Sequence, residues 1–256
     1  MTGARGVRPP VGEIVAVTTT TFTAQSYTLN EAPPFGSLLR VAVLRGMTGG
    51  RLEAGGPRGY GIAAYYALCY GSQTGSIEPG RQAVAWGRFE DDEEDVYRRQ
   101  PQLAQVLRTT FDALLVGYDT DTSAVTWSDG DVESDDVTAD YRANGHAASG
   151  AMVASAAIRA GAPEQRVPGT PPRLHALVCQ ATAAETIRFN RNLAYLRFVL
   201  RANLPLADDF IAAAIAHAYE AGGRDEAFLL DAARGVARLL GAEHERVMNI
   251  LELLDA

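Results

Sequence analysis

The sequence predicts an α+β protein: an N-terminal antiparallel β-barrel of six or seven short strands with one inserted helix, then about four C-terminal helices. The first half of the chain is rich in Val, Thr, Ile and Tyr without helical periodicity, and Gly/Pro turns interrupt it. After Thr182, apolar residues recur instead at helical spacing. With 256 residues, of which 47% are hydrophobic, the chain can bury a sizeable core.

The barrel strands are predicted from β-branched and aromatic runs between turn-forming residues. They cover residues 11–29 (one or two strands), 35–44, 60–70, 82–89, 113–119 and 123–127. Turns are expected at 30–34 and 71–80, and a Gly-rich loop at 46–59. The spacing of Leu103, Val106, Leu107 and Phe111 predicts the inserted helix, over residues 95–112.

Four amphipathic helices are predicted near the C-terminus. Thr182 and Glu185 have the spacing of a capping box, and the helix that they begin carries its apolar stripe as far as Leu200. The next helix is expected to be capped by Asp208, the one after it to run from about Asp225, and both to end at glycines. A fourth follows around 247–254. We therefore expect a barrel over 1–127, an irregular excursion or linker over 128–170, and a helical region over 171–256.

The charge pattern excludes several kinds of chemistry. All 23 basic residues are Arg, so the chain has no P-loop lysine, Schiff-base lysine or pyridoxal-phosphate attachment site. The formal net charge is −8, and acidic residues concentrate at Glu90–Asp95 and between Asp119 and Asp140. Because a surface of that sign repels phosphate backbones, we expect no direct nucleic-acid binding.

No catalytic constellation or metal motif is present in the sequence. The four histidines lack zinc-site spacing, and the acidic loop from Asp119 to Gly130 lacks the glycine and terminal acid of an EF-hand, although a loosely bound cation there remains an open alternative. Asp119 ends an apolar strand in the manner of a Walker-B motif, but no Walker-A loop precedes it. We predict a protein without cofactor that is not an enzyme.

Cellular location is inferred from the cysteines and from the hydropathy pattern. Cys69 and Cys179 lie in apolar runs without a C-x-x-C partner, so we expect buried, inert thiols in a reducing compartment. The sequence contains no secretory h-region and no apolar run long enough to span a bilayer. The expected location is the cytoplasm.

Several short motifs resemble a known barrel family. The segments Val11–Val17, Pro33–Leu38 and Tyr60–Ile62 are similar to the helicase-and-ATP-synthase (HAS) barrel at the N-terminus of HerA-type DNA translocases. Residues 101–118 and 171–175 resemble stand-alone bacterial proteins in which this barrel precedes a helical tail. In the translocases the barrel packs against neighbouring copies and offers a docking surface to a nuclease, whereas a separate domain is the ATPase. Because these 256 residues contain no lysine, we expect no such ATPase domain among them.

The resemblance implies an assembly or adaptor module that mediates oligomerisation or docking in a larger complex, with an ATPase or nuclease as the expected kind of partner. Two alternatives stay open: a permanent subunit of a multi-protein complex, and a barrel that binds a small ligand or metal through its acidic loops. The residues chosen as partner contacts, because Arg and aromatic side chains dominate interface energetics, are Phe35, Arg40, Arg81 and Arg173.

Overall fold

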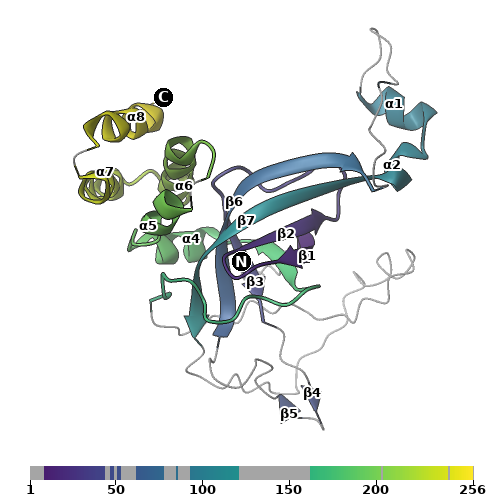
Figure 1. Cartoon of the computed structure of the whole chain (residues 1–256), viewed down its shortest axis with the longest axis horizontal. Coiled ribbons are helices and arrows are strands. Elements are labelled where there is room, and N and C mark those ends of the chain that lie inside the picture. Colours follow the sequence, from purple (N-terminus) through teal and green to yellow (C-terminus); the bar gives the residue numbers. More distant parts are fainter. Residues whose placement is uncertain are drawn as a thin grey trace, which may run out of the picture.

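A closed barrel of six strands forms the centre of the molecule, and helices cover one side of it (Figure 1). The computed structural model describes residues 9–43, 47–48, 51–52, 62–77, 85, 93–120, 162–202, 204–241 and 243–255. The strands are β1 (Gly12–Val17), β2 (Thr21–Ser26), β3 (Leu38–Ala42), β6 (Ile62–Ser76), β7 (Leu107–Thr120) and β8 (Leu177–Gln180). They pair antiparallel in the closed order β1-β2-β7-β6-β3-β8, which confirms the predicted barrel and the α+β class. A separate two-stranded sheet joins β4 (Met47–Thr48) and β5 (Arg51–Leu52).

Both faces of the central strands are apolar, because one lines the barrel interior and the other meets the helices. In β6, Tyr65 and Ala67 belong to the interior cluster, whereas Tyr66 and Leu68 belong to the cluster shared with the helices. Side chains on a strand alternate between faces, so a strand buried on both sides has a continuous apolar sequence. This explains the uninterrupted apolar run that predicted this strand.

The sixth strand comes from the region that was predicted to be helical. β8 pairs with β1 on one side and with β3 on the other and so closes the barrel. It lies within 171–256, so the barrel is not confined to residues 1–127. With four residues, β8 is too short for periodicity to mark it as a barrel strand.

The prediction of one helix over 95–112 is wrong in its second half. Helix α1 (Glu93–Arg99) and the short α2 (Leu103–Val106) are followed directly by β7, which begins at Leu107. Phe111 points into the barrel interior instead of along a helix face. The long pairing of β7 with β6 and β2 overrides the local helical spacing.

The prediction of a turn over 71–80 is also wrong in part, because β6 continues to Ser76. The Gly, Ser and Thr residues of this stretch suggested a turn, but they form strand pairs with β7. The predicted strands at 123–127 and, apart from Ala85, at 82–89 lie outside the described residues, as does the linker at 128–170 up to residue 161.

The helices after the barrel are α4 (Ala183–Asn190), α5 (Leu196–Arg201), α6 (Ala207–Ala221), α7 (Glu226–Leu240) and α8 (His244–Asp255). The capping box is confirmed: the amide of Glu185 donates to the Thr182 hydroxyl at 3.2 Å, and the Thr182 amide donates to the Glu185 carboxylate at 2.8 Å. The first predicted helix is in fact two, since the chain leaves the helix between α4 and α5.

The predicted helix start near Asp225 is confirmed, and Asp225 is the N-cap of α7, where its side chain accepts a hydrogen bond from the amide of Ala227. The predicted cap at Asp208 is wrong: Leu206, with a left-handed backbone (φ 57°), occupies the N-cap position of α6. Asp208 lies in the first turn of α6 and accepts a 2.6 Å hydrogen bond from Nη2 of Arg246, which ties α8 to α6.

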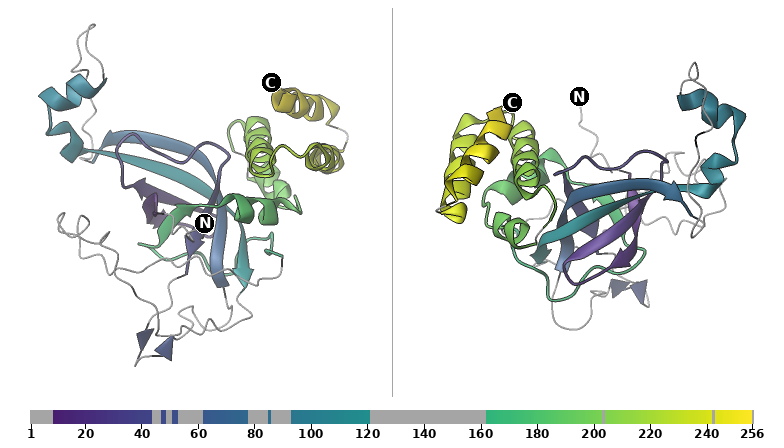
Figure 2. Two further views of the ribbon diagram at one scale, coloured as in Figure 1. Left: turned by 180° about the vertical axis from the view of Figure 1, so that it is seen from behind. Right: turned by 45° about the horizontal axis from the view of Figure 1, so that its top comes forward.

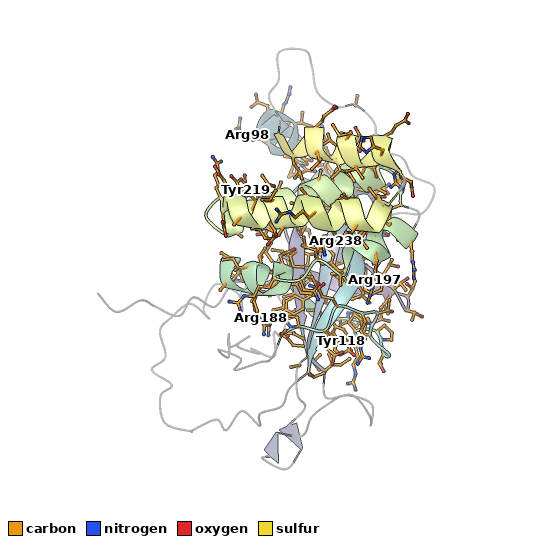
Figure 3. All side chains as sticks on the ribbon, turned by 90° about the vertical axis from the view of Figure 1, so that its left-hand side faces the viewer. Arg98, Tyr118, Arg188, Arg197, Tyr219 and Arg238 are labelled. Atoms are coloured by element: carbon orange, nitrogen blue, oxygen red, sulfur yellow. The ribbon has the colours of Figure 1, made fainter. Side chains whose placement is uncertain are left out.

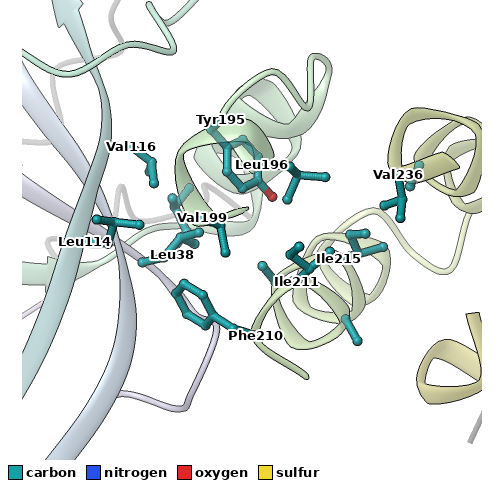
Figure 4. Packing of buried hydrophobic residues seen from close by; sticks show 14 of the residues in the cluster. Leu38, Leu114, Val116, Tyr195, Leu196, Val199, Phe210, Ile211, Ile215 and Val236 are labelled. Carbon is teal, nitrogen blue, oxygen red and sulfur yellow. The ribbon is translucent and has the colours of Figure 1, made fainter. Parts of the chain in front are cut away.

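The helices pack on the outer face of the barrel in two layers. Figure 4 shows Leu38, Leu114 and Val116 of the barrel facing Val199 of α5 and Phe210 of α6. Helices α7 and α8 form the layer farthest from the barrel (Figure 2). None of the helices in the described ranges has both the length and the apolar character that a membrane span requires.

Candidate functional site

A buried polar cluster joins the barrel to α4. The Tyr66 hydroxyl donates to Oδ2 of Asp119 at 2.8 Å and accepts from Nη2 of Arg188 at 2.6 Å. Arg188 also forms an ion pair with the same Asp119 oxygen. The Asp119 side chain is only 1% exposed and that of Arg188 is 22% exposed. Tyr66 of β6 and Arg188 of α4 therefore both bind the Asp119 carboxylate of β7.

The electrostatics of this cluster favour one anion, one cation and one neutral phenol. Burial, together with the neighbouring Asp119 carboxylate, raises the pKa of Tyr66 well above its ordinary value. Burial by itself would lower the pKa of Arg188, but the hydrogen bonds and charge interactions with Asp119 and Tyr66 together outweigh it, and the pKa is raised. The charges balance within the cluster, so it acts as a structural tie. Asp119 is thus neither a Walker-B acid nor a free oxygen ligand, since Arg188 and Tyr66 occupy its carboxylate.

A second polar centre forms around Gln165, in the segment that leads from residue 162 to β8. Its side-chain Nε2 donates to the carbonyl of Phe189 at 2.6 Å and also to that of Asn192, and its Oε1 accepts from the amide of Tyr195 at 3.1 Å. These groups lie where α4 ends and α5 begins. Buried backbone groups need hydrogen-bond partners, and the Gln165 side chain supplies them to backbone groups between α4 and α5.

The same segment is held to the barrel at β7. Glu164 and Tyr118 exchange both backbone hydrogen bonds at 2.9 Å. Gly117 makes this approach possible, because an added Cβ would lie 2.5 Å from the Glu164 carbonyl oxygen. The hydroxyl of Tyr118 in turn accepts from Nε of Arg166 at 2.6 Å.

The barrel interior is filled by side chains. The largest fully buried residues there include Phe22, Phe111, Ile14, Leu39 and Leu115. Cys69 and Cys179 are both buried, as predicted. Burial raises the pKa of Cys69 to about 11, so its thiol stays protonated at neutral pH and is a poor nucleophile.

The residues predicted as partner contacts differ in their exposure and in their contacts within the molecule. Phe35 is 37% exposed, and its ring centroid lies 5.2 Å from that of Phe210 on α6. Arg173 is exposed on the segment before β8, and Arg81 lies outside the described residues. Arg40 differs from the expectation of an exposed contact: its side chain is 12% exposed, and its Nε lies 3.1 Å from the Glu185 carboxylate. It pairs within the molecule, across the junction of β3 and α4.

Two of the three histidines in the described residues have a polar partner, and the third, His244 at the start of α8, is exposed. His175 pairs with Glu13 of β1, and Nε2 of His217 lies 3.0 Å from the carbonyl oxygen of Phe35. His146 lies outside the described residues. In the part of the chain that the structure describes, His, Cys, Asp and Glu side chains do not form a group that could hold a metal.

Beyond the barrel, β6 and β7 continue as a two-stranded ribbon that carries α1 and α2 (Figure 1). We call residues 74–77 and 93–109 the arm. Its strand pairs run from Thr74 opposite Thr109 to Ser76 opposite Leu107, whereas β2 pairs with β7 only from Thr110 onwards. Sequence reasoning missed the arm because its polar strand residues were interpreted as a turn.

The fold and these contacts define a six-stranded antiparallel barrel with an arm and a layered helical region. The sequence matches no protein-family model and no curated protein.

Proposed function

We propose that this protein is a non-enzymatic assembly module, which docks to another protein or to further copies of itself within a larger complex. The proposal rests on the resemblance to HAS-barrel proteins, in which the barrel is an assembly part, and the chain has the closed barrel followed by helices that this role requires. By that resemblance, an ATPase or nuclease is the expected kind of partner, and the cytoplasm is the expected location.

The arm is the observation that carries this proposal. A two-stranded ribbon is marginally stable by itself in water, and the arm with α1 and α2 projects from one end of the barrel in the views of Figures 1 and 2. Nδ2 of Asn30, outside the arm, donates a 2.8 Å hydrogen bond to the Tyr97 hydroxyl of α1. Ile77, at the end of its first strand, is 46% exposed. Such an element gains stability from contact with another molecule.

The interior of the molecule favours assembly over ligand binding. Aromatic and aliphatic side chains fill the barrel, and the buried polar groups around Asp119 and Gln165 are used to join the barrel to the helices. The outer helices expose large apolar side chains instead, among them Leu230 on α7 (53%) and Met248 on α8 (44%). Exposed side chains of this type are also compatible with a permanent subunit of a complex.

The test compares the whole protein with a variant that lacks the arm. Replacing residues 74–109 by an Asn-Gly turn joins Gln73 to Thr110, which already face each other in the β6–β7 register. We expect tagged wild-type protein, isolated from its own cells, to retain a stoichiometric partner or to have an oligomeric native mass. The variant should remain folded and lose that association. A wild-type protein that is monomeric and without a stoichiometric partner would refute the assembly role.

A further inference from the structure

Arginines are concentrated in the part of the chain that joins the barrel to the helices. Residues 165–207 contain six Arg and a single acidic residue, Glu185, a net charge of +5. Since the whole chain has a net charge of −8, the remaining residues carry −13. A cationic segment within an otherwise acidic protein requires a physical explanation.

Gln165 brings several of these arginines to one place. Arg166 is its neighbour in sequence, and Arg197 donates from Nη2 to the Gln165 carbonyl at 3.2 Å. The side chain of Gln165 binds the carbonyl of Asn192, next to Arg191. Arg201 follows Arg197 by one turn of α5, so both lie on the same face of that helix. We call Arg166, Arg191, Arg197 and Arg201 the arginine surface; Figure 3 labels Arg197 together with Arg188 and Tyr118 on the face turned to the viewer.

Nearby acidic side chains balance only part of the positive charge of the arginine surface. Nε of Arg166 lies 2.7 Å from Glu164. Arg191, Arg197 and Arg201 are exposed, and within the described ranges no acidic side chain lies at ion-pair distance from them. The Arg197 guanidinium lies 4.8 Å from the ring centroid of Phe198, and this contact and the hydrogen bond to Gln165 hold it in place.

We propose that the arginine surface docks an acidic segment of a partner protein; this rests on the proposed assembly function and names the chemistry of the partner. A guanidinium offers parallel N–H donors that match the two oxygens of a carboxylate. An ordered guanidinium such as that of Arg197 loses less side-chain entropy when it binds.

An acidic peptide segment fits this surface better than a nucleic acid does. A duplex is an extended polyanion, and the net charge of −13 on the rest of the chain repels it beyond the arginine surface. The carboxylate of Glu164, 2.7 Å from Nε of Arg166, also lies at the edge of this surface. A short acidic segment needs to contact only the local cationic region.

The test measures binding of a fluorescein-labelled oligoglutamate peptide by fluorescence anisotropy, with the full-length protein at low and at moderate salt. The variant Arg191→Glu with Arg197→Glu reverses two charges of the arginine surface. The control variant, Arg224→Glu with Arg234→Glu, makes the same change of net charge at exposed positions next to and on α7. We expect wild-type and control to bind alike, and the first variant to bind about tenfold or more weakly, with the binding of all three reduced by salt.

Two results would overturn the proposal: no binding by the wild-type protein at low salt, or equal binding by the two variants. Duplex DNA that displaces the peptide and binds more tightly would also overturn it, in favour of a nucleic-acid surface. The assay needs no natural partner. A natural partner that the arm deletion releases, but that the variant Arg191→Glu with Arg197→Glu still binds, would support the assembly role. That result would reject the arginine surface as the docking site.

Discussion

Asp119 shows how single residues hold the two parts of the molecule together. Its carboxylate is almost fully buried, which would cost several kcal/mol for an uncompensated charge. Arg188 supplies the opposite charge and Tyr66 a hydrogen bond. Because the three groups come from β6, β7 and α4, the ion pair specifies where α4 lies on the barrel.

Removing one member of the pair should be costly because it leaves the other charge unbalanced. We expect Asp119→Asn to destabilise the protein by about 2 to 3 kcal/mol, measured by urea unfolding. Arg188→Gln should have a similar effect, and the double variant should be less destabilised than the sum of the two. Additive effects in this double-mutant cycle would show that the pair contributes no coupling.

At the scale of elements, residues 164–165 connect the barrel to the helices, and we call them the strap. Glu164 pairs with Tyr118 of β7, and Gln165 binds the backbone between α4 and α5. The approach of the strap depends on Gly117, where a Cβ would lie 2.5 Å from the Glu164 oxygen and 2.9 Å from Cε2 of Phe189.

Gly117→Ala should therefore displace the strap or the Phe189 ring and destabilise the protein by about 2 to 3 kcal/mol. Gly71→Ala on β6 is the matched control, because nothing lies within 4 Å of an added Cβ there. The control should stay within about 0.5 kcal/mol of wild type in thermal or urea unfolding. A similar stability for the two variants would contradict the close contact.

At the scale of the whole molecule, one apolar cluster spans the outer face of the barrel and all the helices from α4 to α8. Several groups that ionise at alkaline pH are buried in or near the two cores. Burial raises the pKa of Tyr65, Tyr66, Tyr70 and Tyr195, and that of Cys69 to about 11.

These shifts predict that stability is lost at high pH. The unfolded chain releases protons near the ordinary values, 9.0 for Cys and 10.0 for Tyr, whereas the folded protein retains them. The melting temperature should therefore be constant with respect to these groups below about pH 9 and should fall above it. Tyr66→Phe should cost about 1 kcal/mol at neutral pH and make the alkaline decrease less steep. A melting temperature that does not change up to pH 11 would contradict this prediction.

The sequence by itself determined the class of the fold, the positions of the capping box and of the later helices, and the absence of lysine chemistry. These properties are local, because a cap depends on residues three positions apart and an amphipathic stripe on neighbouring turns. The motif at Thr182 and Glu185 is therefore visible before any contact is known.

Only the tertiary structure decided which segments pair and which charges meet. Tyr66 and Asp119 are 53 positions apart, and Asp119 and Arg188 are 69 apart. No spacing rule links them, and the four residues of β8 and the first residues of β7 adopt strand conformation because partner strands lie beside them. The arginines around Gln165 form one surface for the same reason, since long-range packing places them there.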